Sequence, residues 1–115
     1  MTSFLEHKAN ENWVIQRYLH NPVLIGGPHW NNTPLRKFDI RMFGVAQIVE
    51  GVHFRGYFFK EGYIRTSSYE FNLDDLEDRD VHLTNDAVQD RNEEYSKYEP
   101  GNKISMKDFA QFLKA

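Results

Sequence analysis

The sequence predicts an α/β fold of the α+β kind, in which a mainly antiparallel sheet is closed by a C-terminal helix. Two observations support this. β-branched and aromatic residues dominate 38–49 and 52–59, and Glu50 and Gly51 separate these runs as the turn of a hairpin would. Further along, Ser105 is a good N-cap for a helix over 106–115. A chain of 115 residues supports one core, so we expect a single domain over 1–115 with no internal boundary.

The first half of the chain predicts strands joined by short turns. Residues 13–19 alternate weakly and are rich in β-formers, which predicts a strand that ends at Asn21 and Pro22. The turn formers of 26–34 predict a loop. We expect 38–49 and 52–59 at the centre of the sheet. The tight turn at 60–62 then leads into a third strand, in meander order.

Beyond Ser68 the residues favour a long irregular segment with one short helix near 87–95. The final helix is predicted to place four apolar residues on one face: Met106, Phe109, Phe112 and Leu113. No Gly or Pro follows Leu113, so we expect the sequence to be a fragment.

Composition narrows the class of protein. The net charge of −3 argues against general nucleic-acid binding. Residues 1–66 carry eight Lys and Arg against five Asp and Glu, whereas 67–115 carry six against twelve. The basic half suits phosphate or an acidic polypeptide, although ordinary surface charge explains it equally well. Without cysteine there is no disulfide framework, and without a long apolar run or signal peptide we expect a cytoplasmic protein with no membrane partner.

Several common chemical motifs are missing from the sequence. The Gly26-Gly27-Pro28 stretch lacks the features of a phosphate loop, and Ser67-Ser68 lacks a nucleophile elbow. The five histidines have no metal-ligand spacing, and the acidic run 74–80 lacks the pattern of a calcium loop. The sequence therefore predicts no metal site of its own.

One strand carries an unusual stripe of charge. In "RKFDIR" the period-two alternation places Phe38 and Ile40 on one face and Lys37, Asp39 and Arg41 on the other. A solvated sheet face with cross-strand ion pairs would explain the stripe, and so would a ligand site.

Four phrases in order identify a resemblance: "VIQRYLHNPVLI", "RKFDIR", "YFFKEGYIRTSS" with "NLDDL", and "HLTNDAVQ" leading to "YSKYEPGN". Together they resemble the tubulin–tyrosine ligase family, whose catalytic core is an ATP-grasp fold. The resemblance runs from about residue 13 to the C-terminus. "EGYIRTSS" and the "YSKYEPGN" ending are more similar to the tyrosine ligase branch than to the polyglutamylases.

The resemblance implies roles for particular residues. Arg41 and Arg65 would be catalytic, with Arg41 facing the reacting phosphate and Arg65 holding an anionic group of the substrate. Lys103 would bind the amino-acid end of the substrate. The residues implied to bind ATP are Gln16, Arg17, Tyr18, Leu19, Lys37, Asp39, Thr84 and Asn85.

The implied function is ATP-dependent ligation of an amino acid (tyrosine, glutamate or glycine) to a carboxylate of a tubulin tail. The implied cofactors are ATP and Mg²⁺, whose ligands would lie outside this chain because the downstream metal-binding strand is missing, as is the first subdomain. The implied partners are the tubulin tail and an amino acid, and the implied location is the microtubule or cilium. A non-catalytic tubulin-binding module and an inactive truncated product remain as alternatives.

The resemblance also sharpens the interpretation of the charged stripe. Asp39 and Arg41 are predicted to be partners within the cleft, and Arg65 is predicted to approach the same face. Three basic residues with only Asp39 between them would repel one another, which predicts that an anion normally lies there.

Overall fold

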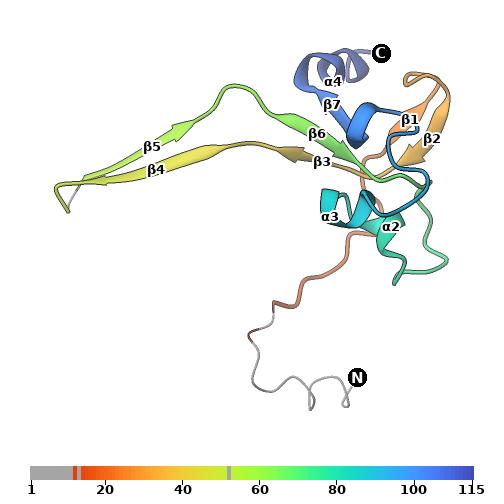
Figure 1. Ribbon diagram of the computed structural model, residues 1–115, viewed down its shortest axis with the longest axis horizontal. Helices are drawn as coiled ribbons and strands as arrows, with labels where there is room; N and C mark the ends of the chain where they lie inside the picture. The colour runs from red at the N-terminus through yellow and green to blue at the C-terminus, as the bar shows by residue number, and fades with distance from the viewer. Residues whose placement is uncertain (1–11, 13, 52) are drawn as a thin grey trace.

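A computed structural model describes residues 12, 14–51 and 53–115 of the chain. It is mixed α/β structure with antiparallel sheets and a C-terminal helix, which confirms the predicted fold class. Figure 1 shows short elements gathered in one folded body, from which a long two-stranded ribbon extends. The described elements are β1 (Ile25–Gly27), β2 (Thr33–Arg36), β3 (Phe38–Arg41), β4 (Gly44–Val49), β5 (His53–Phe58), β6 (Tyr63–Thr66), α2 (Arg79–His82), α3 (Asp86–Gln89), η1 (Pro100–Asn102), β7 (Lys103–Ser105) and α4 (Met106–Phe112).

One long hairpin organises the middle of the chain, as predicted. β4 pairs antiparallel with β5, and its turn holds Glu50 and Gly51 at φ of 53° and 69°. Glycine adopts this left-handed region without the steric cost that a side chain adds. The predicted strand 38–49 is interrupted between β3 and β4, where a hydrogen bond of 2.9 Å from the Phe59 N–H to the Phe43 carbonyl keeps the two arms together.

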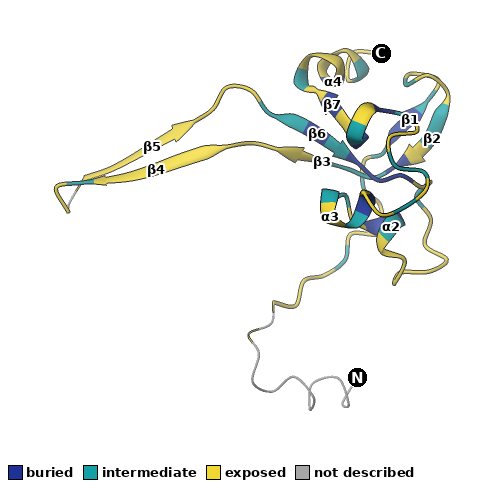
Figure 2. Ribbon diagram, viewed as in Figure 1, coloured by how far each residue is buried: buried dark blue, intermediate teal, exposed yellow. Residues whose placement is uncertain are grey.

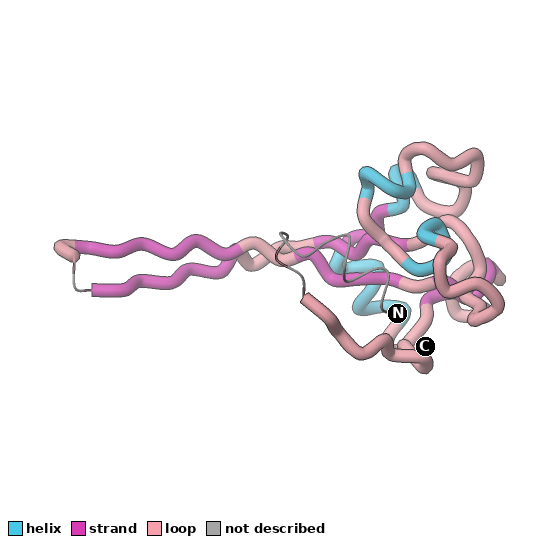
Figure 3. The backbone as a smooth tube through the Cα atoms, turned by 90° about the horizontal axis from the view of Figure 1, so that it is seen from below, coloured by secondary structure: helices cyan, strands magenta, loops and turns pink. Residues whose placement is uncertain are grey.

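The order of the strands differs from the prediction. β6 lies at the centre of a three-stranded sheet in the order β3-β6-β7, so the expected meander and the central place of 38–49 and 52–59 are wrong. Residues 59–62 join β5 to β6 without reversing the chain, so the predicted tight turn at 60–62 is wrong, and the two ends of the same hairpin, β3 and β6, pair with each other. β4 and β5 instead form an exposed ribbon, which Figures 2 and 3 show projecting alone.

A second hairpin occupies the predicted loop. β1 pairs antiparallel with β2, with a bulge between Ile25 and Gly27, so only 28–32 form the turn itself. Gly26 makes this pairing possible, because its φ is 140° and a Cβ there would lie 2.1 Å from the Pro34 carbonyl oxygen. The two strands were missed because turn formers dominate their sequence.

The predicted strand over 13–19 is not formed. Trp13 lies outside the described residues, and 14–19 have neither helix nor strand. Val14 and Ile15 are 83% and 85% exposed, and no described strand lies beside them to accept their hydrogen bonds. β-propensity alone does not form a strand without a neighbour.

The segment after β6 is more ordered than expected. The predicted helix at 87–95 is one turn long and ends at Gln89. Another short helix, α2, begins after Asp78, whose carboxylate accepts hydrogen bonds from the Asp80 and Val81 N–H groups. Residues 103–105 then return to the sheet as β7, a strand the sequence did not indicate.

The core lies where α4 covers the three-stranded sheet. Ile25, Ile64, Ile104 and Phe109 are buried together. Ser105 caps α4 as predicted, because its Oγ accepts a 3.0 Å hydrogen bond from the Asp108 N–H. Met106 and Phe112 also pack against the core, with Trp30 and Phe38. Leu113 and Ile40 do not: they are 64% and 51% exposed, contrary to the predicted faces.

Candidate functional site

Asp39, Arg65 and Thr84 meet at one point on the three-stranded sheet, and we call them the Asp39 centre. Asp39 lies directly opposite Arg65 in the β3–β6 register. The Arg65 Nε and Nη2 atoms donate to the two Asp39 carboxylate oxygens at 2.9 and 2.7 Å. Thr84 Oγ1, from the segment between α2 and α3, donates to the same carboxylate at 2.9 Å. Three segments distant in sequence thus meet at one carboxylate.

The contacts of this centre fix its charges. Burial raises the pKa of Asp39, but the hydrogen bonds from Arg65 and Thr84 and the charges of Arg65 and Arg41 outweigh burial and lower it. The hydrogen bond to Asp39 raises the pKa of Arg65. Arg65 donates two N–H groups to Asp39. Because a guanidinium has five N–H groups, Arg65 has further donors that can bind an anion.

The charged row continues onto β7. Lys103 lies opposite Arg65 in the β6–β7 register, and its ammonium is 3.0 Å from the carboxylate of Asp86 at the start of α3. The hydrogen bond that its ammonium donates to Asp86 raises the pKa of Lys103. Asn85 precedes Asp86 and is exposed, and its side chain makes no capping hydrogen bond. The structure therefore brings Asp39, Arg65, Thr84, Asn85 and Lys103 to one region.

Arg41 occupies a different environment from the one predicted. It is exposed, and its guanidinium lies 5.5 Å from the centroid of the Phe43 ring. The partner of Asp39 is Arg65, so the predicted pairing of Asp39 with Arg41 is wrong. The reason is register, since the residue directly across from Asp39 on β6 is an arginine. Among the described residues, Arg41 makes no ion pair and its charge is available.

A hollow of about 540 Å³ contains the other predicted site residues. Its lining is Val14, Gln16, Arg17, Tyr18, Leu19, Pro22 and Lys37. Tyr18 is half-buried, and the Lys37 ammonium lies 3.4 Å from its hydroxyl and 4.9 Å from its ring centroid. The backbone of 14–24 makes no hydrogen bond to any other described residue.

The sequence reasoning missed a buried ion pair between Arg36 and Glu99. Arg36 is fully buried, and it donates to Glu99 from Nη2 at 2.5 Å and from Nη1 at 3.0 Å. Trp30 Nε1 and Thr66 Oγ1 donate to the same carboxylate at 2.7 and 3.0 Å. Burial raises the pKa of Glu99, and these hydrogen bonds with the Arg36 charge lower it overall. No local pattern joins residues so distant in sequence.

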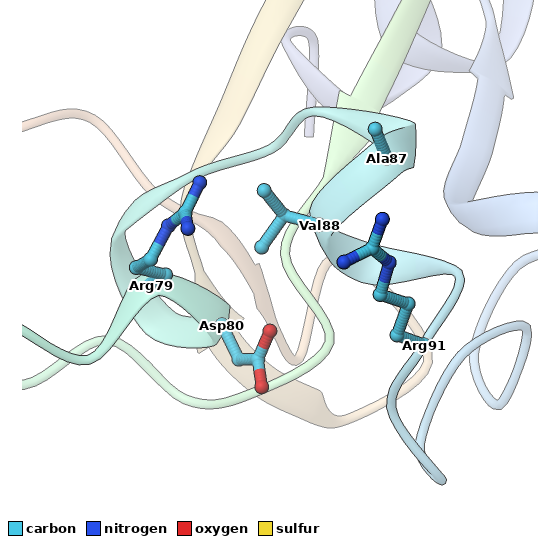
Figure 4. Close-up of a pocket in the computed structure, with 5 residues that line it drawn as sticks. All are labelled: Arg79, Asp80, Ala87, Val88 and Arg91. Atoms are coloured by element: carbon cyan, nitrogen blue, oxygen red, sulfur yellow. The ribbon is translucent and has the colours of Figure 1, made fainter.

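A further hollow of about 450 Å³ lies between α2 and α3 and contains none of the predicted site residues. Figure 4 shows the Arg79 and Arg91 side chains on either side of Val88, with Asp80 below them. Within the described part of the chain, no cluster of three His, Asp or Glu side chains could hold a metal ion. No helix there is long and apolar enough to cross a membrane.

Comparison with known proteins gives consistent matches. A family model described as "Tubulin-tyrosine ligase family" matches residues 1–114. "Tubulin glycylase 3B" of Tetrahymena thermophila is 41% identical over 102 residues, which are 89% of this chain and 8% of that protein. "Probable tubulin polyglutamylase TTLL9" of Bos taurus is 37% identical over 103 residues, which are 90% of this chain and 20% of that protein. The chain thus spans a fifth or less of the length of these relatives.

Proposed function

The chain belongs to the tubulin-tyrosine ligase family, and from that premise we propose that it contributes to ATP-dependent ligation of an amino acid to a tubulin tail. Relatives named as a glycylase and as a probable polyglutamylase support a tubulin substrate. The observation that carries the proposal is the Asp39 centre. There the Asp39 carboxylate holds the half-buried Arg65, whose remaining N–H groups can donate to a ligand, and Lys103 lies beside it on the next strand. The protein would act at a microtubule or cilium.

The geometry supports different roles for the 540 Å³ hollow and the Asp39 centre. The backbone of 16–19 and the Lys37 ammonium would hold ATP in the 540 Å³ hollow, and Asp39, Thr84 and Asn85 would contact the nucleotide as well. Bound ATP supplies the phosphoryl group that activates a carboxylate. Arg41, which makes no ion pair with a described residue, would offer a cation to that charge.

Arg65 would hold a carboxylate of the substrate. Asp39 fixes its guanidinium plane with a bidentate contact, so the remaining N–H groups point in a set direction. Lys103, oriented by Asp86, lies on the next strand and would bind the amino-acid end. For Mg²⁺ the described residues do not fit, since they offer no group of metal ligands.

The amino acid is tyrosine, glutamate or glycine. The motifs favour the tyrosine ligase branch, whereas the relatives above carry the names glycylase and polyglutamylase. The choice is tested by incubating microtubules with the full-length polypeptide, ATP and each labelled amino acid in turn. Tyrosine incorporation alone would support the branch assignment, and incorporation of glutamate or glycine instead would reject it.

The alternative is a tubulin-binding module without chemistry. Isothermal titration of the full-length polypeptide with ATP and its co-pelleting with microtubules separate the two. ATP binding that Lys37→Ala weakens would support the ligase. Co-pelleting without any ATP binding would reject the nucleotide site and leave the binding module.

A further inference from the structure

We propose that His82 is a positioning residue for the nucleotide pocket, which acts through Tyr18 on the 14–22 segment and on the Lys37 ammonium. The inference rests on the proposed binding of ATP in that pocket. It goes beyond the predicted site, because neither the sequence patterns nor the resemblance implies a role for His82.

The partners of His82 fix the direction of a hydrogen-bond chain. Its Nε2 atom lies 2.9 Å from the Asp75 carbonyl oxygen, which can only accept, so Nε2 carries a proton. In the neutral ring, Nδ1 is then an acceptor, and it lies 2.7 Å from the Tyr18 hydroxyl. Tyr18 therefore donates to His82, and its oxygen lone pairs face the Lys37 ammonium at 3.4 Å. Each donor in the chain meets an acceptor.

The imidazole is held firmly in this orientation. His82 is the last residue of α2 and is 6% exposed. Its ring packs edge to face against Tyr18 and Phe71, with centroid distances of 5.5 and 5.8 Å. A buried polar ring with both nitrogens satisfied loses hydrogen bonds if it turns, so rotation is costly.

Tyr18 in turn anchors the wall of the pocket. Across the described residues, the only hydrogen bonds that join 14–24 to the rest of the chain are those of Tyr18. The segment has no strand or helix of its own to fix it. Its position beside Lys37 thus depends on Tyr18, and the position of the Tyr18 hydroxyl depends on His82.

A purely packing role for His82 makes a different prediction. If the ring only fills space, His82→Phe keeps most of the contact area and leaves ligand affinity unchanged. In the positioning role, His82→Phe and Tyr18→Phe break the same hydrogen bond, so their effects on affinity are not additive.

The test is isothermal titration of the full chain with ATP, using His82→Phe, Tyr18→Phe and the double variant. We expect each single variant to bind about 3- to 10-fold more weakly, as for loss of one hydrogen bond, and the double variant to bind no more weakly than Tyr18→Phe, which also loses the contact with Lys37. His53→Phe is the control, since His53 is exposed on the β4–β5 ribbon and does not line the 540 Å³ hollow. Its affinity should equal that of the wild type.

Nitrogen NMR of the unliganded chain gives a second readout, the position of the proton on the His82 ring, which packing alone would not determine. We expect the proton on Nε2 of His82 in the wild type and in Tyr18→Phe alike, because the Asp75 carbonyl remains, and a changed Nδ1 resonance in Tyr18→Phe, where Nδ1 has lost its donor. A proton on Nδ1 instead would overturn the inference. If His82→Phe does not fold, the Tyr18→Phe titration and the tautomer carry the test.

The outcomes separate this inference from the proposed function. If the wild type binds ATP and the single variants bind equally well, or if their losses add in the double variant, the positioning role is wrong and the nucleotide site stands. If the wild type binds no ATP, the nucleotide site is wrong and the inference built on it falls as well.

Discussion

Replacing Glu99 by glutamine should destabilise the fold strongly, although the two side chains have nearly the same shape. Glu99 is 4% exposed, and both of its carboxylate oxygens accept from the guanidinium of the fully buried Arg36. One oxygen also accepts from Trp30 and the other from Thr66. Whichever way the new amide turns, its NH₂ group faces an Arg36 N–H donor, and Arg36 is left as a buried charge without a described counterion.

The size of the effect follows from these contacts. Removing one partner of a buried ion pair costs about 3–5 kcal/mol, because the remaining charge stays desolvated. We expect Glu99→Gln to fall near the lower bound of about 3 kcal/mol, since the amide oxygen still accepts from one side. For a domain with a free energy of unfolding of about 5–15 kcal/mol, this loss is a large fraction of the total.

Urea unfolding followed by far-UV circular dichroism measures this change. The matched control is Glu94→Gln, which removes the carboxylate from the exposed pair with Lys97 and should leave the unfolding midpoint unchanged. A loss below about 1 kcal/mol for Glu99→Gln, or equal losses for the two variants, would show that Arg36 does not depend on the Glu99 charge.

Other predictions test the charged groups and the cap. Because the folded-state pKa values of Asp39 and Glu99 are lowered, their contribution to stability is present above the unfolded values and is lost as pH falls through the folded ones. The urea concentration at the unfolding midpoint should therefore decrease once the pH is lowered below about 4. This decrease should be less steep in Asp39→Asn. Arg41→Ala should leave the melting temperature unchanged, because Arg41 is exposed and makes no described ion pair. Incorporation of the labelled amino acid by the full-length polypeptide should drop at least tenfold, and unchanged incorporation would remove Arg41 from the site. Ser105→Ala should cost about 1 kcal/mol in urea unfolding through loss of the α4 cap, and an unchanged midpoint would show that the cap is not needed.

Local signals were enough to predict several elements. The Glu50 and Gly51 turn and the Ser105 cap depend on residues within a few positions, and both are present. Pairing of β6 with β3, and the addition of β7, depend on which strands the hairpin and the long 67–102 segment bring together. Period-two alternation fixes the two faces of a strand, but it does not reveal whether a third strand or a helix will cover either face.

In the candidate site, too, local features could be predicted and long-range pairings could not. The Lys37, Asp39 and Arg41 stripe was visible in six residues of sequence, but its pairing was not. Arg65 became the partner of Asp39 through register alone. The Arg36 and Glu99 pair could not be predicted, because 62 intervening residues separate the two and neither has a distinctive local context.

That buried pair also has a consequence for how the chain folds. Closing the Glu50 and Gly51 turn places β6 beside β3 without any further loop, and hairpins of this kind form in about 1–10 μs. Glu99 reaches Arg36 only after the 67–102 segment has closed, which carries the larger entropic cost. Until then the Arg36 guanidinium must stay hydrated, so water leaves this part of the core last. We therefore expect the contacts of Glu99 to form after the rate-limiting step, so that the ion pair slows unfolding and leaves the folding rate nearly untouched.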